Sequence, residues 1–387
     1  MAKVHCLNKI SPVGLAVLPK GYSVSEELNE SVEAILVRSA VMHEMELPKS
    51  VLCVARAGAG VNNIPLEDLA KKGVVVFNTP GANANAVKEL TIAMMLLAAR
   101  DIRGSMEWVR ENKGDPEINK TMEKAKSKFA GTEILGKTLG VIGCGAIGAF
   151  VADSAKKLGM KVIAVEPSKA VLERNAELLK GVEIVSSDEL YERSDYITVH
   201  VPLMDATRGM LCEATFSKMK DGVIIINAAR DALVNDDDMA KVLASGKVRR
   251  YVTDFPNAKT ANMEGVVAIS HLGASTEEAE DNCAVMAVKQ IEQYLEHGNI
   301  VNSVNYPNLS LDKVTGKRVV VLYEVREGIE SEVLEALKPY GVKASISGAK
   351  GKFGASLFEV EKEPQKVTVP VPQKVTVPGV TRTLVIC

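Results

Sequence analysis

Two side chains suited to acid–base and anion-binding chemistry follow apolar runs in the second half of the chain. Arg230 comes directly after GVIIINAA, and His271 comes directly after VVAIS. Arginine can hold a carboxylate through two parallel hydrogen bonds and polarise the adjacent carbonyl. Histidine titrates near neutrality, so it can exchange a proton with an alcohol. Each residue alone also fits a structural role, but the pair, with a hydride carrier, predicts oxidoreduction of a 2-hydroxy acid.

The stretch GVIGCGAIG at 140–148 predicts the site of that hydride carrier. Gly143 permits a tight turn, Gly145 lets the backbone approach a pyrophosphate, and Gly148 allows a helix to pack closely on the preceding strand. The helix would then present its free N–H groups to the phosphates. Glu166 ends the next apolar run and can accept hydrogen bonds from both ribose hydroxyls, which favours NAD over NADP.

These residues must be positioned by the elements between them, and apolar runs alternate with helical patterns in two stretches. The expected strands of the first stretch lie at 34–39, 50–55 and 73–78, and its helices at 65–72 and 84–100. The expected strands of the second lie at 138–143, 161–166, 182–186, 196–201, 222–227, 251–255 and 266–270. This alternation predicts an α/β fold with two doubly wound parallel-sheet domains. A long helix is expected from Ser275, as its N-cap, to Gly298.

Two other segments have a different character. Residues 101–130 are charged and helical in composition, and we expect them to form a connector. After residue 313 the pattern predicts a small α+β module with β-α-β-β order. Its tail repeats QKVTVPVP and QKVTVPGV over 365–380, where the prolines favour edge strands or extended chain.

Composition limits the kinds of partner. The 387 residues suggest two or three domains, and a net charge of -2 gives no reason to expect nucleic acid or an anionic membrane. No apolar run approaches the length of a membrane span, the start lacks a signal peptide, and the six cysteines have no metal-ligand spacing. We therefore expect a cytoplasmic protein with reduced thiols and without a metal site.

Taken in order, NTPGANANAVKEL, the glycine stretch, HVPLMDATRGML, INAAR and SHLGASTEEA resemble the D-isomer-specific 2-hydroxyacid dehydrogenases. The resemblance covers roughly residues 35–305. It implies a Rossmann nucleotide domain inserted into a flavodoxin-like substrate domain. The implied order is 1–95 for the first part of the substrate domain, 96–282 for the NAD-binding domain, 283–312 for the return, and 313–387 for a module that resembles an ACT domain or serves as a structural appendage.

The resemblance also implies roles for single residues. Arg230 would bind the substrate carboxylate and carbonyl, and His271 would be the acid/base. The residues implied to line NAD are Gly143, Gly145, Ala146, Ile147, Gly148, Glu166, Val201, Pro202, Ala228, Asp254 and Gly273. The residues implied to bind a small phosphorylated hydroxy acid are Arg38, Arg56, Ala57, Gly58, Ala59 and Gly60. Residues 84–130 would form a homodimer or a higher oligomer.

The sequence departs from the family pattern at two positions. Asp231 follows Arg230 where the family has glycine, so the turn must tolerate a side chain. Lys259 stands where the family has a glutamate that pairs with the histidine, and Glu264 is too near His271 in sequence to be assigned that role. We expect a working histidine with a shifted pH profile. The alternatives are a dehydrogenase of an unphosphorylated acid and a non-catalytic NAD-sensing protein.

Overall fold

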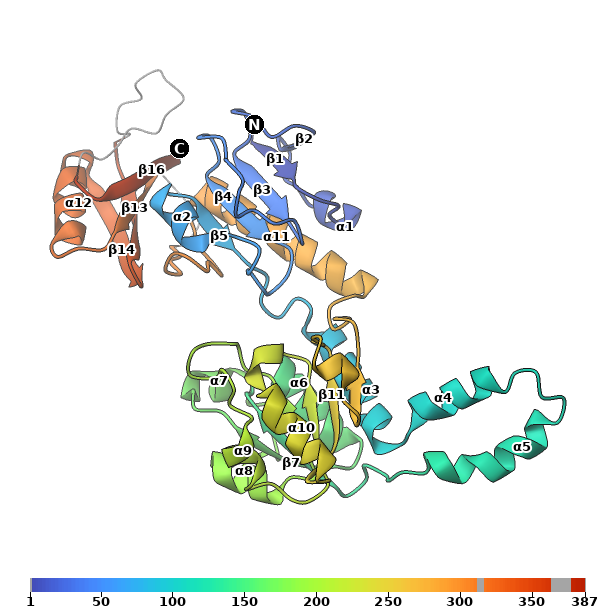
Figure 1. The fold of residues 1–387 in the computed structure, drawn as a ribbon. Coiled ribbons are helices and arrows are strands. Elements are labelled where there is room, and N and C mark those ends of the chain that lie inside the picture. The colour runs from blue at the N-terminus through green and yellow to red at the C-terminus, as the bar shows by residue number, and fades with distance from the viewer. Residues whose placement is uncertain (1, 312–316, 363–376, 387) are drawn as a thin grey trace. The chain divides into compact units, whose positions relative to one another are not determined.

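A computed structural model describes residues 2–311, 317–362 and 377–386 of the chain. Its contacts divide the chain into two compact units (Figure 1). The middle unit is Ala84–Thr276, and the terminal unit combines Met1–Asn83 with Glu277–Cys387.

The middle unit is built on a seven-stranded parallel sheet in the order β12-β11-β10-β9-β6-β7-β8. Its strands are β6 (Thr138–Ile142), β7 (Lys161–Val165), β8 (Glu183–Ile184), β9 (Tyr196–Val199), β10 (Val223–Asn227), β11 (Val248–Thr253) and β12 (Val266–Ala268). Counted from β6, the order is the 3-2-1-4-5-6 of a Rossmann fold with one more strand. This confirms the fold predicted for this part of the chain. Ligands of such sheets bind beyond the carboxyl ends of β6 and β9, where the strand order reverses.

Helices accompany these strands, and a helical arm stands apart from them. The helices beside the strands are α3 (Ala84–Ala99), α6 (Ala146–Lys157), α7 (Lys169–Arg174), α8 (Ser187–Arg193), α9 (Glu213–Phe216) and α10 (Asp236–Ala244). The arm contains α4 (Ile102–Glu111) and α5 (Ile118–Ala125) and projects from the rest of this unit (Figure 1). Helix α4 has no buried residue and α5 has one, Ala125, so the unit itself covers little of the arm.

The terminal unit contains a five-stranded parallel sheet in the flavodoxin-like order β2-β1-β3-β4-β5, which confirms the second predicted fold. Its strands are β1 (Lys3–Cys6), β2 (Ser23–Ser25), β3 (Ala34–Val37), β4 (Cys53–Arg56) and β5 (Val75–Phe77), and its helices include α1 (Pro12–Leu15), α2 (Leu66–Lys71) and α11 (Glu277–His297). Helix α11 begins at Glu277, so Ser275 lies one position too early to be the predicted N-cap. Thr276, which directly precedes the helix, has a side-chain hydroxyl like that of Ser275 and stands at the N-cap position.

The C-terminal module of the terminal unit is a four-stranded antiparallel sheet in the order β14-β15-β13-β16. Its elements are β13 (Lys317–Glu324), α12 (Ile329–Leu337), β14 (Val342–Lys350), β15 (Phe353–Val360) and β16 (Val380–Ile386). The strand order is that of the split β-α-β arrangement. Strand β16 was not predicted from the sequence. Most of the repeat expected to be extended, 365–376, lies outside the described residues.

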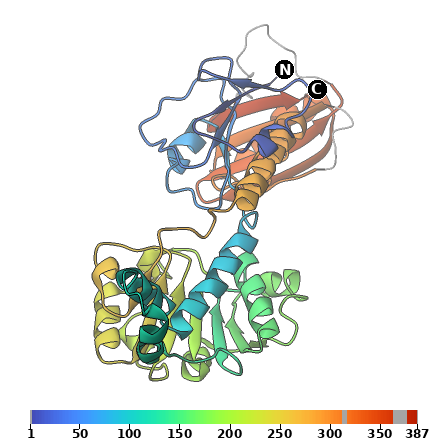
Figure 2. The same ribbon diagram turned by 90° about the vertical axis from the view of Figure 1, so that its right-hand side faces the viewer.

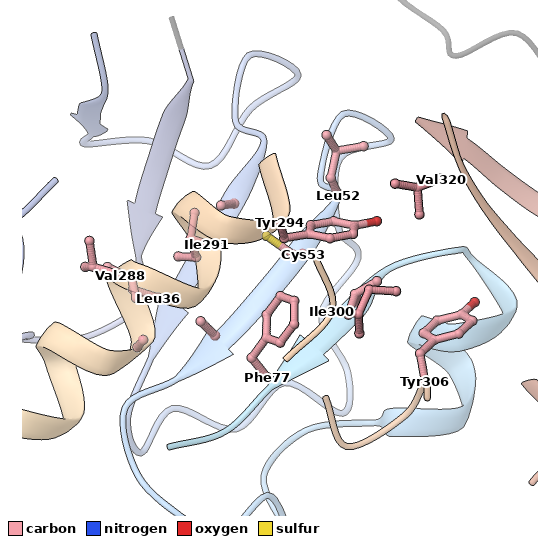
Figure 3. Packing of buried hydrophobic residues seen from close by; sticks show 14 of the residues in the cluster. Leu36, Leu52, Cys53, Phe77, Val288, Ile291, Tyr294, Ile300, Tyr306 and Val320 are labelled. Carbon is pink, nitrogen blue, oxygen red and sulfur yellow. The ribbon is translucent and has the colours of Figure 1, made fainter. Parts of the chain in front are cut away.

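One hydrophobic core joins this module to the parallel sheet. Val320 from the module is buried in the same cluster as Leu36, Phe77 and Ile291 (Figure 3). Leu357 from the module belongs to this cluster too. Helix α11 contacts strand β16 of the module, and Figure 2 shows the helix in front of the module's strands. The opposite face of the antiparallel sheet packs in a second cluster with α12. The module is therefore an integral part of the terminal unit and not a tethered domain.

Candidate functional site

The turn after β6 has the geometry that a dinucleotide needs. Gly143 has a φ of 90°, and a Cβ added there would lie 2.8 Å from the carbonyl oxygen of His200. A Cβ on Gly148 would lie 1.9 Å from the Gly143 carbonyl oxygen, so helix α6 can approach the turn only without one. A Cβ on Gly145 would meet no heavy atom within 4 Å. Gly145 is also the N-cap of α6 and makes no side-chain capping bond, which leaves the helix N-terminus open to an anion.

Glu166, at the end of β7, is tied to this turn. Its Oε2 accepts a hydrogen bond from the amide of Cys144 at 2.9 Å, and its Oε1 accepts one from the amide of Ser168 at 2.9 Å. Each carboxylate oxygen can accept a second hydrogen bond. The structure therefore fixes Glu166 beside the glycine turn with acceptor capacity for ribose hydroxyls.

On the other side of the turn, the end of β9 provides partly exposed apolar surface at Val201 and Pro202. The neighbouring His200 bonds through Nε2 to Thr198 Oγ1 at 2.9 Å. Burial lowers the pKa of His200 from 6.5 to about 4, so its imidazole is neutral at physiological pH. Of the other residues predicted to line the cofactor, Ala146 is exposed, Ile147 is partly buried and Ala228 is buried.

Arg230 is held by the end of β10. The Asn227 side chain accepts hydrogen bonds from the amides of Ala229 and Arg230 at 3.0 and 3.3 Å and donates one to the Arg230 carbonyl at 2.7 Å. The turn tolerates Asp231 because that residue starts a 3₁₀ helix without a positive φ. Burial lowers the pKa of the Arg230 guanidinium, yet arginine stays cationic in proteins. Asn227 was missed in the sequence, although a polar residue ending the run VIIIN was a visible signal.

The backbone that follows His271 is held by Asp254, which comes directly after β11. Asp254 is 1% exposed, and its two carboxylate oxygens accept the amides of Leu272 and Gly273 at 2.7 and 2.8 Å. His271, directly before them, has a φ of 54°, a left-handed conformation that is uncommon outside glycine. Burial raises the pKa of Asp254, while these backbone bonds and the charge of His271 act in the opposite direction. An ionised Asp254 would therefore attract a positive charge on His271.

Phe255 is a second residue that sequence reasoning missed. Its ring lies 4.3 Å from the ring of His271, and the Arg230 guanidinium carbon lies 5.1 Å from the ring centre. Lys259, by contrast, donates to Asp237 on α10 at 2.8 Å and is exposed. Lys259, which stands at the position of the family glutamate, therefore forms a surface ion pair.

The predicted phosphate-binding residues lie together in the terminal unit. Arg56, at the end of β4, donates through Nε to the carbonyl of Arg38 at 3.0 Å. The Arg38 guanidinium pairs with Glu280 on α11 at 2.6 Å. Gly58, with a φ of 149°, lies so close to Arg56 that an added Cβ would be 1.9 Å from the arginine Nη1.

The loop 57–60 that was predicted to hold the carboxylate has two of its amides engaged. The amide of Ala57 donates to the Val37 carbonyl at 2.8 Å, and that of Gly58 to the Arg56 carbonyl at 2.9 Å. By that prediction, the amides left for the substrate carboxylate would be those of Ala59 and Gly60.

No helix in the described part of the chain is long and apolar enough to cross a membrane. Residues 2–311, 317–362 and 377–386 contain no cluster of three or more His, Cys, Asp or Glu side chains placed to hold a metal ion.

Sequence comparisons agree with this geometry. The family model for the NAD-binding domain of D-isomer specific 2-hydroxyacid dehydrogenases matches residues 92–273. D-3-phosphoglycerate dehydrogenase from Archaeoglobus fulgidus is 37% identical over 309 residues, which are 76% of this chain and 56% of that protein. Hydroxypyruvate reductase from Thermotoga maritima is 38% identical over 272 residues, which are 67% of this chain and 84% of that protein. The chain thus spans little more than half the length of the first relative.

Solved structures also match. NAD⁺-bound 3-phosphoglycerate dehydrogenase from Entamoeba histolytica has a TM-score of 0.62 at 26% identity, over 80% of this chain and 99% of that one. A glyoxylate reductase from Paecilomyces thermophila has a TM-score of 0.65 at 26% identity, over 78% of this chain and 98% of that one.

Proposed function

Because the chain belongs to the D-isomer specific 2-hydroxyacid dehydrogenase family, we propose that it oxidises D-3-phosphoglycerate to 3-phosphohydroxypyruvate, the entry to serine biosynthesis. Its cofactor is NAD. The middle unit would bind NAD, and the terminal unit would hold the distal end of the substrate. The observation that carries the choice of substrate is the contact of Arg56 with Arg38, which places two arginines in one loop cluster. An unphosphorylated acid has no distal charge for two guanidinium groups to meet.

The chemistry assigned to the middle unit follows from its polar groups. When bound, NAD supplies the hydride acceptor for the alcohol carbon. Arg230 already donates to the Ala229 carbonyl at 2.6 Å, and its other N–H groups would bind the substrate carboxylate and the developing carbonyl. His271 would take the hydroxyl proton. The ionised Asp254 would stabilise the imidazolium that forms.

A second candidate is a reductase of an unphosphorylated 2-oxo acid such as hydroxypyruvate or glyoxylate. The observation that favours it is the ion pair of Arg38 with Glu280 at 2.6 Å, because a phosphate would have to displace that carboxylate. The hydroxypyruvate reductase relative is as similar to the chain as the phosphoglycerate dehydrogenase relative.

We also propose that the protein is a cytoplasmic homodimer or higher oligomer joined through the arm. Met106, Val109 and Met122 are 68%, 48% and 45% exposed on α4 and α5. Apolar side chains exposed together on adjacent helices would form an interaction surface. A second copy of the arm would cover them.

The test is NADH formation, followed by nicotinamide absorbance at mildly alkaline pH, with D-3-phosphoglycerate, D-glycerate and D-lactate in parallel. The proposal expects turnover confined to the phosphorylated acid. Equal turnover of D-glycerate would move the assignment to the reductase. Tight NADH binding without turnover of any acid would contradict both and leave an NAD-sensing protein.

A further inference from the structure

Three strand ends of the middle unit meet at one aromatic ring. Phe255 follows β11, Arg230 follows β10 and His271 follows β12. The Phe255 and His271 rings lie 4.3 Å apart with an interplanar angle of 43°, and the Arg230 guanidinium carbon lies 5.1 Å from the same phenyl ring. The two residues with proposed chemical roles thus share one apolar neighbour.

The position of this ring is fixed on both sides by the backbone. The amide of Phe255 donates to Thr253 Oγ1 at 3.0 Å. Asp254, directly before it, accepts the amides of Leu272 and Gly273, which follow His271. The phenyl ring and the imidazole are therefore carried by two segments that Asp254 ties together. Separating the two segments would break a buried carboxylate hydrogen bond.

We propose that Phe255 is a positioning residue that holds the imidazole of His271 and the guanidinium of Arg230 at a fixed separation. The inference rests on the proposed function, because it assigns a role around the same acid/base. An aromatic face attracts cations, so one ring can hold the arginine and also favour the imidazolium during turnover. The tilted contact also restricts rotation of the imidazole. This arrangement supplies orientation through an aromatic side chain at a site where Lys259, in place of the family glutamate, pairs with Asp237.

The contact has a signature that does not depend on activity. Protons close to a phenyl ring experience its ring current, so the imidazole resonances of His271 should move when the ring is removed. We would label the full chain with ¹³C-histidine, assign His271 from the His271→Gln variant, and compare Phe255→Leu with Phe255→Tyr. The leucine variant should move the His271 resonances, and the tyrosine variant should leave them near the wild-type positions.

Kinetics then test the role. We expect Phe255→Leu to lower kcat/KM about 5- to 30-fold through loss of two cation–aromatic contacts, mainly in kcat, with unchanged NADH affinity. Phe255→Tyr should restore kcat/KM to within about two-fold of wild type, because tyrosine keeps the ring face. Phe150→Leu, which alters a phenylalanine 38% exposed on α6, is the control for loss of a ring elsewhere and should change neither readout.

The outcomes separate this inference from the proposed function. If the wild type oxidises none of the acids, the proposed function fails, while the shift of the His271 resonances still decides the contact. Unmoved His271 resonances in Phe255→Leu would overturn the inference. So would full kcat/KM in that variant, or a loss that Phe255→Tyr does not rescue. If Phe255→Leu does not fold, Phe255→Met, which keeps a flexible apolar side chain without a ring, decides by the same two readouts.

Discussion

Substituting alanine for Gly145 and substituting alanine for Gly148 should impair different properties of the protein, although the two glycines are only three positions apart. A Cβ on Gly148 would lie 1.9 Å from the Gly143 carbonyl oxygen, which is backbone and cannot rotate away. Overpacking of this kind costs about 1–3 kcal/mol of the free energy of unfolding. For a unit the size of Ala84–Thr276, that lowers the melting temperature by roughly 2 to 12 °C.

Gly145 presents the opposite case. A Cβ there meets nothing within 4 Å, and its φ of -62° suits alanine. Gly145→Ala should therefore raise the free energy of unfolding slightly, by about 0.4–1 kcal/mol, because alanine restricts the unfolded chain. The methyl group would occupy the space through which a pyrophosphate approaches the backbone. Loss of one hydrogen bond to a charged group predicts roughly 10- to 100-fold weaker NADH binding.

The assay pairs thermal melting with titration of NADH fluorescence for each variant. Gly114→Ala is the matched control, because a Cβ there also meets nothing within 4 Å and the residue lies between α4 and α5. The reasoning is refuted if Gly145→Ala binds NADH as tightly as Gly114→Ala does. It is equally refuted if Gly148→Ala melts with the wild type.

Three further predictions concern Arg382, His200 and the exposed methionines of the arm. The guanidinium of Arg382 in β16 donates to the carbonyls of Val51, Lys49 and Lys72 at 2.8, 3.2 and 3.2 Å. Arg382→Ala should therefore lower the free energy of unfolding by about 1.5–3 kcal/mol, as measured by urea titration. An unchanged urea midpoint would contradict this. His200 binds its proton less readily when folded, so the stability provided by its neutral form is present above pH 6.5 and lost as pH falls towards about 4. His200→Gln should therefore flatten the decline of the urea midpoint between pH 6.5 and 4, whereas parallel declines would refute the assignment. Replacing exposed Met106 and Met122 by lysine should yield monomers in light scattering with an unchanged melting temperature of the middle unit, and a persisting oligomer would exclude the arm.

The sequence predicted the parts of the fold that local pattern determines. Strands buried on both faces of a parallel sheet read as continuous apolar runs, which is why β6 and β10 were located within one residue at each end. The spacing of Gly143, Gly145 and Gly148 likewise follows from one turn and one helix. Strand β16 was missed because it follows a proline-containing repeat, and prolines disfavour sheet.

Contacts between distant segments could not be predicted from a single sequence. The core shared by the C-terminal module and the parallel sheet depends on residues such as Val320 and Phe77. An apolar side chain does not indicate which distant residue it will contact. The role of Phe255 depends on three strand ends meeting, and a lone aromatic after Asp254 has no diagnostic spacing. The left-handed backbone of His271 could not be predicted either, because only a few per cent of residues other than glycine adopt it.

The central claim is that the arginine cluster of the terminal unit selects a phosphorylated hydroxy acid. The most direct measurement is the ratio of kcat/KM for D-3-phosphoglycerate to that for D-glycerate, in the wild type and in Arg38→Ala. Arg38 and Glu280 are 38% and 40% exposed, so the substitution should leave the melting temperature nearly unchanged. The account predicts a wild-type ratio far above one that falls at least roughly ten-fold in the variant, through KM for the phosphorylated acid. A ratio near one in the wild type, or a ratio that Arg38→Ala leaves unchanged, would contradict it.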